Sequence, residues 1–305
     1  MGKPKEFEKG IAETYIRDWR KALEYFEKAN QKKPGDEEIL TWIGYTHQNL
    51  GNYHEAQEIL LRTFKQNPQS KDILFFLSMS FLYLGDIAKA IDYAEKLVQQ
   101  DSKDPSTWAL AARVYLLTDD EEMGIQYGEK ALKLDPKNKT SAFYVFFDRG
   151  NFYLNKGQYV KAIESYNNFL EKDSKNAGAL VCLGWVYYLN EDAINRIQVA
   201  EDLIKQSKKS RTLTKESKIA FTSLGYYLKG DLENALKEAQ QAVKSNERCY
   251  DALIALAVAY YGKGDYKQSY EAFIRAQQLQ AFDPIDKPFF IGVFEAVKQH
   301  HEKSS

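Results

Sequence analysis

The residues that most often carry out chemistry are few in this chain, and they do not form a motif. The 305 residues include four histidines and two cysteines: His47, His54, His300, His301, Cys182 and Cys249. A zinc site uses three or four His, Cys or carboxylate ligands at short, regular spacings. No such spacing surrounds these side chains, so the sequence predicts no metal site.

Two further patterns resemble parts of enzyme sites but lack the residues that would act. Gly225 and Gly230 have the spacing of a phosphate-binding loop, yet Asp231 stands where that loop needs Lys. The carboxylates of 119–122 fall in a predicted turn, where acidic side chains favour the start of a helix. We therefore predict neither catalysis nor a cofactor.

Composition argues against several other classes of protein. The chain has 42 Lys and Arg residues against 43 Asp and Glu, so no net basic field favours binding to nucleic acid. The longest apolar run, 252–261, is about half of the roughly 20 residues that a membrane span needs. Charged residues follow Met1 almost at once, so no secretory leader is visible. We expect a cytoplasmic protein; a periplasmic or membrane-tethered protein is the alternative, if a leader has been removed.

What recurs instead is a spacing of small and aromatic residues about every 34 residues, which is the period of a helical repeat. In one unit the markers are Gly44, Gly51, Ala56 and Pro68. With Ala56 as the reference position, the units are 3–36, 37–70, 71–104, 105–138, 143–176, 177–210, 216–249 and 250–283. Each unit predicts a helix, a tight turn, a second helix and a linker. One such unit cannot bury its apolar face alone, so we expect the units to stack.

Each marked position has a physical role. Glycine after the first helix permits a left-handed backbone, which we predict for Gly51, Gly85, Gly157, Gly230 and Gly264. The next residue can cap the second helix, and the candidates are Asn52, Asp86, Asp231 and Asp265. A glycine inside the first helix lets its partner helix approach, as we expect at Gly44, Gly150 and Gly184. Proline ends the second helix at Pro34, Pro68 and Pro136.

This pattern resembles the tetratricopeptide repeat family, and the resemblance covers about nine tenths of the chain. It implies an all-α fold, a right-handed α-solenoid (superhelix) of about eight tetratricopeptide helix-turn-helix repeats. Repeats 1–4 would occupy 3–138, repeats 5–6 143–210, and repeats 7–8 216–283. The segment 285–301, which opens with Asp286 and Pro288, predicts a C-terminal capping helix over the last apolar face. A helix that docks on a partner is the alternative.

Two units depart from the family pattern. The fourth has Gly124 and Gly128 where Ala and an aromatic residue are typical. The sixth has Arg196 at an Ala position, which predicts that its second helix shifts to bring Ala200 there.

The register is also interrupted twice, before the fifth unit by 139–142 and before the seventh by 211–215. Next to the second interruption, 205–211 predicts a solvated basic linker. An acidic docking surface, or a loop phosphorylated on Ser207 or Ser210, is the alternative there.

In the family, the second, fifth, ninth, twelfth and thirteenth positions of the first helix line a concave groove. Carried over to this sequence, the predicted partner-binding residues are Thr41, Tyr45, Gln48, Asn49, Phe75, Met79, Leu82, Tyr83, Arg113, Phe147, Asn151, Trp185, Tyr188, Tyr227 and Tyr261. Most are aromatic or aliphatic, which favours an exposed apolar trough; the alternative is that the superhelix buries them. The resemblance does not extend to the family's clamp for chaperone tails, because Phe147 stands where that clamp needs Lys.

We hypothesise a noncatalytic scaffold that binds a peptide or a helical segment of a partner protein in this groove, with Tyr45, Phe75, Met79, Phe147 and Trp185 as anchors. The expected partner is a protein or peptide; nucleic acid and a membrane span are not expected. One alternative is a membrane-tethered bacterial envelope assembly factor that supports pilus, secretion or outer-membrane machinery. The other is a self-assembling structural protein, which would form homo-oligomers.

Overall fold

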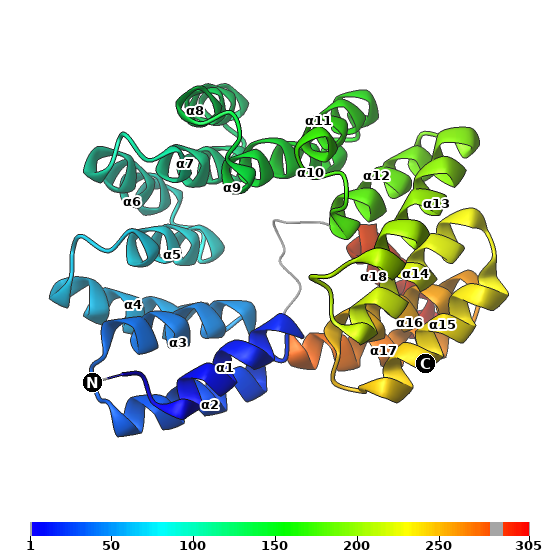
Figure 1. Cartoon of the computed structure of the whole chain (residues 1–305), viewed down its shortest axis with the longest axis horizontal. Helices are drawn as coiled ribbons and strands as arrows, with labels where there is room; N and C mark the ends of the chain where they lie inside the picture. The colour runs from blue at the N-terminus through cyan, green and yellow to red at the C-terminus, as the bar shows by residue number, and fades with distance from the viewer. Residues whose placement is uncertain (1, 281–288, 305) are drawn as a thin grey trace. The chain divides into compact units, whose positions relative to one another are not determined.

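A computed structural model describes residues 2–280 and 289–304, and within these residues every regular element is a helix (Figure 1). The helices follow one another as antiparallel pairs. The pairs of the first four repeats are α1 (Lys5–Tyr15) with α2 (Trp19–Lys32), α3 (Glu37–Asn49) with α4 (Tyr53–Gln66), α5 (Lys71–Tyr83) with α6 (Ile87–Gln100), and α7 (Pro105–Leu117) with α8 (Glu121–Leu134).

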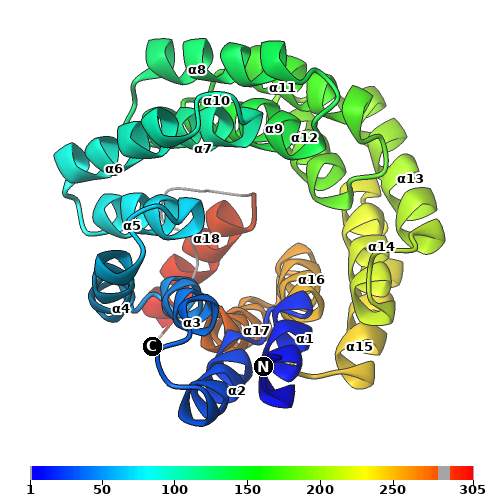
Figure 2. The ribbon, with the colours of Figure 1, turned by 60° about the vertical axis from the view of Figure 1, so that its left-hand side comes forward.

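The later repeats keep the same order (Figure 2). In the fifth, α9 (Lys139–Ala142), the π-helical turn η1 (Phe143–Phe147) and α10 (Asp148–Asn155) together form the first helix, which pairs with α11 (Tyr159–Lys172). Then come α12 (Ala177–Leu189) with α13 (Ala193–Lys209), α14 (Lys215–Lys229) with α15 (Leu232–Ser245), and α16 (Tyr250–Gly262) with α17 (Tyr266–Leu279). The predicted all-α fold of about eight helical pairs is confirmed.

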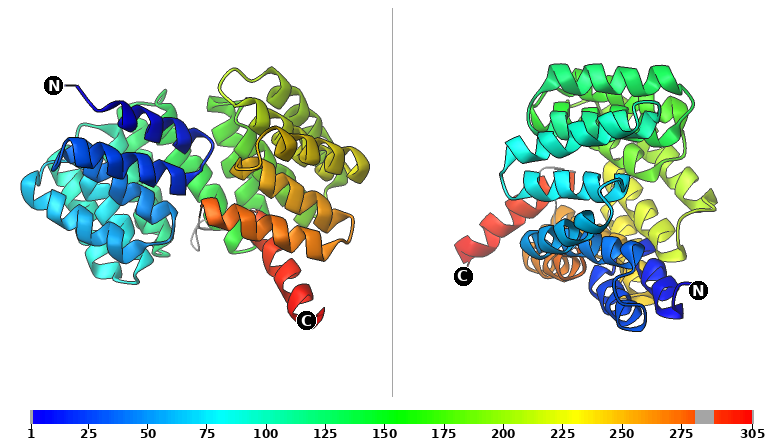
Figure 3. Two further views of the ribbon diagram at one scale, coloured as in Figure 1. Left: turned by 90° about the horizontal axis from the view of Figure 1, so that it is seen from below. Right: turned by 90° about the vertical axis from the view of Figure 1, so that its left-hand side faces the viewer.

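A final helix, α18 (Phe289–Ser304), lies beside α17 (Figure 3). Val293, Phe294 and Val297 are buried, and the ring of Phe294 lies 5.4 Å from that of Phe273 in α17. This apolar stripe covers the end of the last pair, as predicted for a capping helix. The predicted opening residues, Asp286 and Pro288, lie outside the described residues.

The chain divides into two compact units. Unit 1 comprises Met1–Thr14 and Trp19–Phe152, and unit 2 comprises Tyr15–Asp18 and Tyr153–Ser305. Within each unit, the first helices of neighbouring repeats contact one another: α3 with α5 and α5 with α7 in unit 1, and α12 with α14 and α14 with α16 in unit 2. We call the surface made by these helices the first-helix face of each unit.

The turns between paired helices have the predicted left-handed residue. Gly51, Gly85, Gly157, Gly230 and Gly264 all have φ between 69° and 84°. Where the sequence lacks glycine, Arg17, Asp119 and Glu191 adopt φ values of 58°, 68° and 57°. The fold therefore requires this backbone shape at every such turn, and a non-glycine residue adopts it at a conformational cost.

Three of the four predicted helix caps form. The carboxylates of Asp86, Asp231 and Asp265 accept hydrogen bonds from backbone N–H groups in the first turns of α6, α15 and α17. The prediction for Asn52 is wrong, because its side chain makes no cap bond; its amide nitrogen lies 3.3 Å from Nδ1 of His47 instead. The predicted prolines fall two residues beyond the ends of α2, α4 and α8.

Glycines inside helices mark close approaches, though not always to the predicted helix. A Cβ atom on Gly44 would lie 2.7 Å from Leu60 of its partner α4, as predicted. On Gly184 it would lie 2.6 Å from Leu228 of α14, so this glycine makes room for the next repeat and not for α13. The predicted shift of α13 is confirmed: Ala200 is fully buried, whereas Arg196 is half-buried and lines a pocket.

The first interruption of the register is absorbed into a helix, whereas 211–214 of the second lie between α13 and α14. Residues 139–142 add a turn, α9, to the first helix of the fifth repeat, and the N–H of Asp148 donates to the carbonyl of Phe143 across η1. The predicted basic linker is wrong for 205–209, which form the end of α13. Ser207 is fully buried there, so it is not available for phosphorylation.

Candidate partner-binding surfaces

Unit 1 carries a continuous chain of ring contacts, which we call the aromatic ladder. Its members, in order of contact, are Trp19, Tyr45, Phe76, Phe75, Tyr144, Phe143 and Phe147. The ring centroids of Tyr45 and Phe76 lie 4.6 Å apart, and those of Phe75 and Tyr144 lie 6.3 Å apart. Both separations are within the range of favourable ring pairs. The ladder therefore joins α2, α3, α5 and η1 by side-chain contact.

The ladder rings remain partly exposed. Trp19 is buried, but the other six rings are half-buried, so each keeps part of its surface in water. A well-packed core would enclose such rings, because each fully buried large apolar side chain is worth about 1.5–3 kcal/mol. Their partial exposure leaves apolar area that a bound segment could cover.

Polar contacts hold the ladder helices in register. The buried amide of Gln48 in α3 donates to the carbonyl oxygen of Phe76 and to Oγ of Ser80 in α5, both at 2.6 Å. On α3 itself, Nδ2 of Asn49 donates to the carbonyl oxygen of Tyr45 at 2.9 Å. These bonds satisfy polar groups beside the rings and keep α3 and α5 adjacent.

The fourth repeat contributes a cation to the ladder and no ring. Nη1 of Arg113 in α7 donates to both carboxylate oxygens of the buried Asp148, at 3.0 and 3.1 Å. The same guanidinium lies 5.9 Å from the centroid of the Tyr144 ring. Charge pairing neutralises Asp148 inside the unit, and the cation contacts the ring that reaches across to Phe75.

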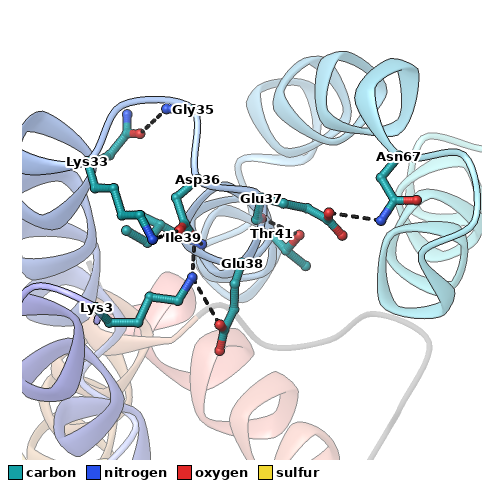
Figure 4. A network of polar contacts seen from close by, with 10 residues as sticks. Lys3, Lys33, Gly35, Asp36, Glu37, Glu38, Ile39, Thr41 and Asn67 are labelled. Atoms are coloured by element: carbon teal, nitrogen blue, oxygen red, sulfur yellow. Dashed lines mark hydrogen bonds and ion pairs between the residues drawn. The ribbon is translucent and has the colours of Figure 1, made fainter. Parts of the chain in front are cut away.

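Three carboxylates, Glu37, Glu38 and Asp72, lie where α3 and α5 begin. Figure 4 shows two of them in use: Glu38 pairs with Nζ of Lys3 at 3.1 Å, and Glu37 accepts a hydrogen bond from Nδ2 of Asn67 at 2.8 Å. Lys3 also pairs with Asp36. The acidic side chains of α3 are therefore occupied by contacts within unit 1.

Asp72 is different, because its exposed carboxylate has no ion-pair or hydrogen-bond partner in the described part of the chain. Its neighbour Lys71 pairs with Asp101 and Asp104 instead, at 2.7 Å each. The pKa of Asp72 is raised, first because the surrounding protein displaces water and then because Glu37 and Glu38 repel its charge, with Lys71 opposing. Asp72 thus offers an uncompensated negative charge next to the ladder helix α5.

The predicted groove residues of unit 1 separate into two groups. Thr41, Gln48, Met79, Leu82 and Asn151 are buried, and Tyr45, Asn49, Phe75, Tyr83, Arg113 and Phe147 are half-buried. Met79 is only 3% exposed, so a partner could not reach it without repacking. Tyr83 stacks on Tyr53 of α4, with centroids 4.6 Å apart, and takes no part in the ladder. The structure brings together Tyr45, Phe75 and Phe147 from this set.

Unit 2 gathers a second group of predicted residues on its own first-helix face. Trp185 and Tyr188 of α12 stack with centroids 4.9 Å apart, and the guanidinium of Arg196 lies 5.4 Å from the Tyr188 centroid. An open pocket of about 460 Å³ is lined by Tyr188, Leu189, Glu191, Ala193 and Arg196. We call this the phenol pocket.

Two more phenols belong to the neighbourhood of the phenol pocket. Tyr227 of α14 has a raised pKa, first because burial disfavours its anion and then because Tyr188 and Tyr261 lie near it, while Arg196 acts in the opposite direction. Of these groups, Tyr188 and Arg196 line the pocket, whereas Tyr227 and Tyr261 are not part of its lining. At neutral pH the Tyr227 phenol is protonated, so it can donate a hydrogen bond.

Sequence reasoning missed four residues of these surfaces. Phe76 and Tyr144 lie outside the carried-over positions, and Tyr144 reaches the ladder through the π-helical turn, for which the repeat template has no register. Asp72 occupies the second position of its repeat, so the family rule could have named it. From the sequence alone, Arg196 is only a departure from the packing pattern. A cation that does not fit at an Ala position has to lie outside the helix interface, and this signal could have identified it.

The ingredients of catalysis do not come together in the part of the chain that the structure describes. No group of three or more His, Cys, Asp or Glu side chains could hold a metal ion there. Burial raises the pKa of the Cys249 thiol to about 11, which keeps it protonated and poorly nucleophilic at neutral pH. Neither Cys182 nor Cys249 forms a disulfide. The described helices also include none with the length and apolarity that crossing a membrane requires.

Comparisons with known proteins agree with this architecture. Residues 77–139 and 225–284 match the tetratricopeptide repeat model, and residues 16–97 match the model of anaphase-promoting complex, cyclosome, subunit 3. No curated protein is detectably similar to this sequence.

Solved structures share the fold at low sequence identity. Yeast Tom70 superposes with a TM-score of 0.62 at 15% identity, over 98% of this chain and 64% of its own. A thermophilic tetratricopeptide protein of Thermus thermophilus gives 0.53 at 19% identity, over 60% of this chain and 97% of its own. The helical pairs, the turn residues and these matches together make this chain a tetratricopeptide repeat protein. Proteins of this family typically mediate protein–protein interactions and are noncatalytic.

Proposed function

We propose that this protein is a noncatalytic scaffold that binds an extended or helical segment of a partner protein on the aromatic ladder of unit 1. The observation that carries the proposal is the ladder itself, in which six rings joined by ring contacts are each only half-buried. Exposed apolar surface of this kind marks interaction sites, and aromatic side chains dominate binding energy there. Because neither cysteine forms a disulfide, we further propose a reducing compartment, the cytoplasm, as its place of work.

The charge beside the ladder suggests the chemistry of the partner. Asp72 has no counter-ion among the described residues and is repelled by Glu37 and Glu38. A partner that placed Lys or Arg near Asp72, and its apolar side chains on Phe75 and Tyr45, would relieve this repulsion and cover the rings. We therefore propose a segment with both basic and apolar residues.

Peptides selected from a random displayed library on the intact chain provide the test. Phe75→Ala removes a ladder ring, and Tyr83→Ala is the matched control because Tyr83 is half-buried on the same helix but stacks outside the ladder. Loss of a central ring should weaken the selected peptides at least about 10-fold, or ~1.4 kcal/mol, whereas the control should change affinity less than about twofold. If Phe75→Ala and Tyr83→Ala changed the affinity equally, the ladder would not be the binding surface.

A further inference from the structure

Unit 2 carries a cation whose position follows from a packing conflict. The second helix of a tetratricopeptide repeat needs a small residue where it meets the first, and in α13 the residue at that register is Arg196. The helix shifts by one turn, so that Ala200 is buried in its place. Arg196 is thereby expelled from the interface and lines the phenol pocket.

Arg196 has no carboxylate partner among the residues that the structure describes. Its guanidinium contacts the ring of Tyr188, and its Nε–H is buried without a hydrogen-bond acceptor. Arg113 in unit 1 also has a buried Nε–H without an acceptor, but its Nη1 bonds to Asp148. A guanidinium offers five donors in a planar fork, and the terminal N–H groups of Arg196 make no hydrogen bond to the described residues.

The Tyr188 phenol adds a further donor beside this cation, because both residues line the pocket. Within the described residues the Tyr188 hydroxyl makes no hydrogen bond. A protonated phenol donates through its O–H. A guanidinium and such a donor at one pocket select an anionic group, for which charge-assisted hydrogen bonds are strongest.

Apolar side chains line the pocket at Leu189 and Ala193, and others are exposed near Arg196 in the sequence. Tyr188 is 45% exposed, Ile197 is 39% exposed and Ile194 is 83% exposed, although all three are large and apolar. Ile194 and Ile197 lie in the first turns of α13, one helical turn or less from Arg196. Glu191, the other charged residue of the pocket lining, sits in the preceding turn with its side chain exposed. The apolar lining and the anion-seeking pocket together describe a peptide surface.

We propose that the phenol pocket binds a partner segment in which an Asp or Glu carboxylate stands next to large apolar residues. The carboxylate bonds to Arg196 and to the phenol of Tyr188, and the neighbouring apolar side chains pack against Leu189 and Ala193 of the same lining. This site does not use the aromatic ladder, so it stands or fails independently of the function proposed for unit 1.

Fluorescence polarisation with a labelled pentapeptide series tests the site. The series is Gly-Ile-X-Phe-Gly, in which X is Glu, Gln, Lys or phosphoserine, and it is titrated with the intact chain up to millimolar concentration. The Glu peptide should bind at least 10-fold more tightly than the Gln and Lys peptides. Arg196→Gln should abolish this preference, and Arg196→Lys should keep part of the affinity but lose most of the bidentate contribution. Tyr188→Phe should weaken the Glu peptide several-fold.

Arg211→Gln is the control, because Arg211 is an exposed cation of unit 2 and its loss changes the net charge equally. It should leave the Glu preference unchanged. Three results would overturn the proposal: no binding of the Glu peptide, equal binding of the Glu and Gln peptides, or a preference that survives Arg196→Gln. Binding of the phosphoserine peptide alone, or full competition by millimolar inorganic phosphate, would show a general anion site and would also overturn it.

Discussion

Units 1 and 2 are built from the same helical pairs, yet their candidate surfaces differ in the charge that is left without a partner. In unit 1, Arg113 is bonded to Asp148, and the carboxylate of Asp72 has no ion-pair partner among the described residues. In unit 2, Arg196 has no carboxylate partner among the described residues, and its guanidinium contacts the Tyr188 ring. We therefore propose that one scaffold presents a surface for basic segments and another for acidic segments.

Each difference arises from one local change in register. In unit 1, an added turn and the π-helical turn η1 bring Tyr144 to Phe75 and bring Asp148 to Arg113. In unit 2, the shift of α13 buries Ala200 and turns Arg196 to the pocket. The comparison teaches that deviations from the repeat pattern, added to pattern positions such as Tyr45 and Phe75, make the two surfaces differ.

The largest expected effect is a difference in stability between variants of the two arginines. Arg113→Met removes the cation that pairs with the buried carboxylate of Asp148, which should cost about 3–5 kcal/mol of stability. Arg196→Met removes a cation that has no counter-ion and should change stability by less than about 0.5 kcal/mol. Urea unfolding, with hydrogen exchange to locate the loss in α7 and α10, measures both. Similar losses for the two variants would contradict the contrast between the units.

The π-helical turn should be sensitive to the glycine beneath it. A Cβ atom on Gly128 of α8 would lie 2.9 Å from Cγ1 of Val145 in η1, so Gly128→Ala should destabilise unit 1 by about 1–3 kcal/mol through overpacking. The control is Gly178→Ala in α12, where the nearest atom would be 3.4 Å away. That substitution should be neutral or stabilising by up to about 1 kcal/mol. Thermal melting of both variants checks the prediction, and a neutral Gly128→Ala would show that η1 can move freely.

Asp72→Asn should raise the stability of the chain and lower its affinity for a basic ligand. The folded-state pKa of Asp72 lies above its ordinary value of 3.8, so the native state binds this proton more tightly than the unfolded chain does. As the pH rises through the pKa of Asp72, the carboxylate ionises and the free energy of unfolding falls. At pH values well below 3.8 the group is protonated in the folded and the unfolded chain, so this loss of stability is absent. The variant should be more stable at neutral pH, and the advantage should disappear in acid.

For a Lys-bearing peptide on the ladder, Asp72→Asn should reduce affinity about fivefold, or ~1 kcal/mol. Unfolding curves at several pH values and binding titrations at neutral pH provide the two measurements. A variant that is less stable at neutral pH would assign Asp72 a structural role.

The smallest effect concerns the turn before α13. Glu191 holds a left-handed backbone with φ of 57°, so Glu191→Gly should stabilise unit 2 by up to about 1 kcal/mol. The change also removes the negative charge that lines the phenol pocket, so an acidic peptide should bind about twofold more tightly. Gly157→Ala is the opposite control, because a side chain placed at φ of 69° should lower stability. Weaker binding of the acidic peptide by Glu191→Gly would argue against an anion site.

Much of the fold was predictable because repeat packing requires particular residue types at a few positions. Only glycine adopts the turn conformation without cost, and only small residues fit where paired helices meet, so Gly51 and Ala56 alone predict one turn and one interface. Asn52 failed as a cap because it contacts His47, a competition that the repeat pattern does not encode. The carried-over groove positions named Tyr45 and Phe75, whose rings both contact Phe76, but they could not show that Met79 is enclosed.

The missing part of the surfaces depends on residues that break the pattern. Whether 139–142 would loop out or extend a helix depends on packing against α7 and α8, which the sequence alone does not reveal. The direction of Arg196 likewise depends on how far α13 slides. Both outcomes are decided by tertiary contacts, and both determine which charges face a partner.

The most direct measurement compares Lys-centred and Glu-centred peptides on the wild-type chain, on Asp72→Asn and on Arg196→Gln. We expect Asp72→Asn to weaken only the Lys peptide and Arg196→Gln to weaken only the Glu peptide, since each charge serves its own unit. If one substitution weakened both peptides, or if neither substitution changed the peptide of opposite charge, the assignment of two oppositely charged surfaces would be contradicted.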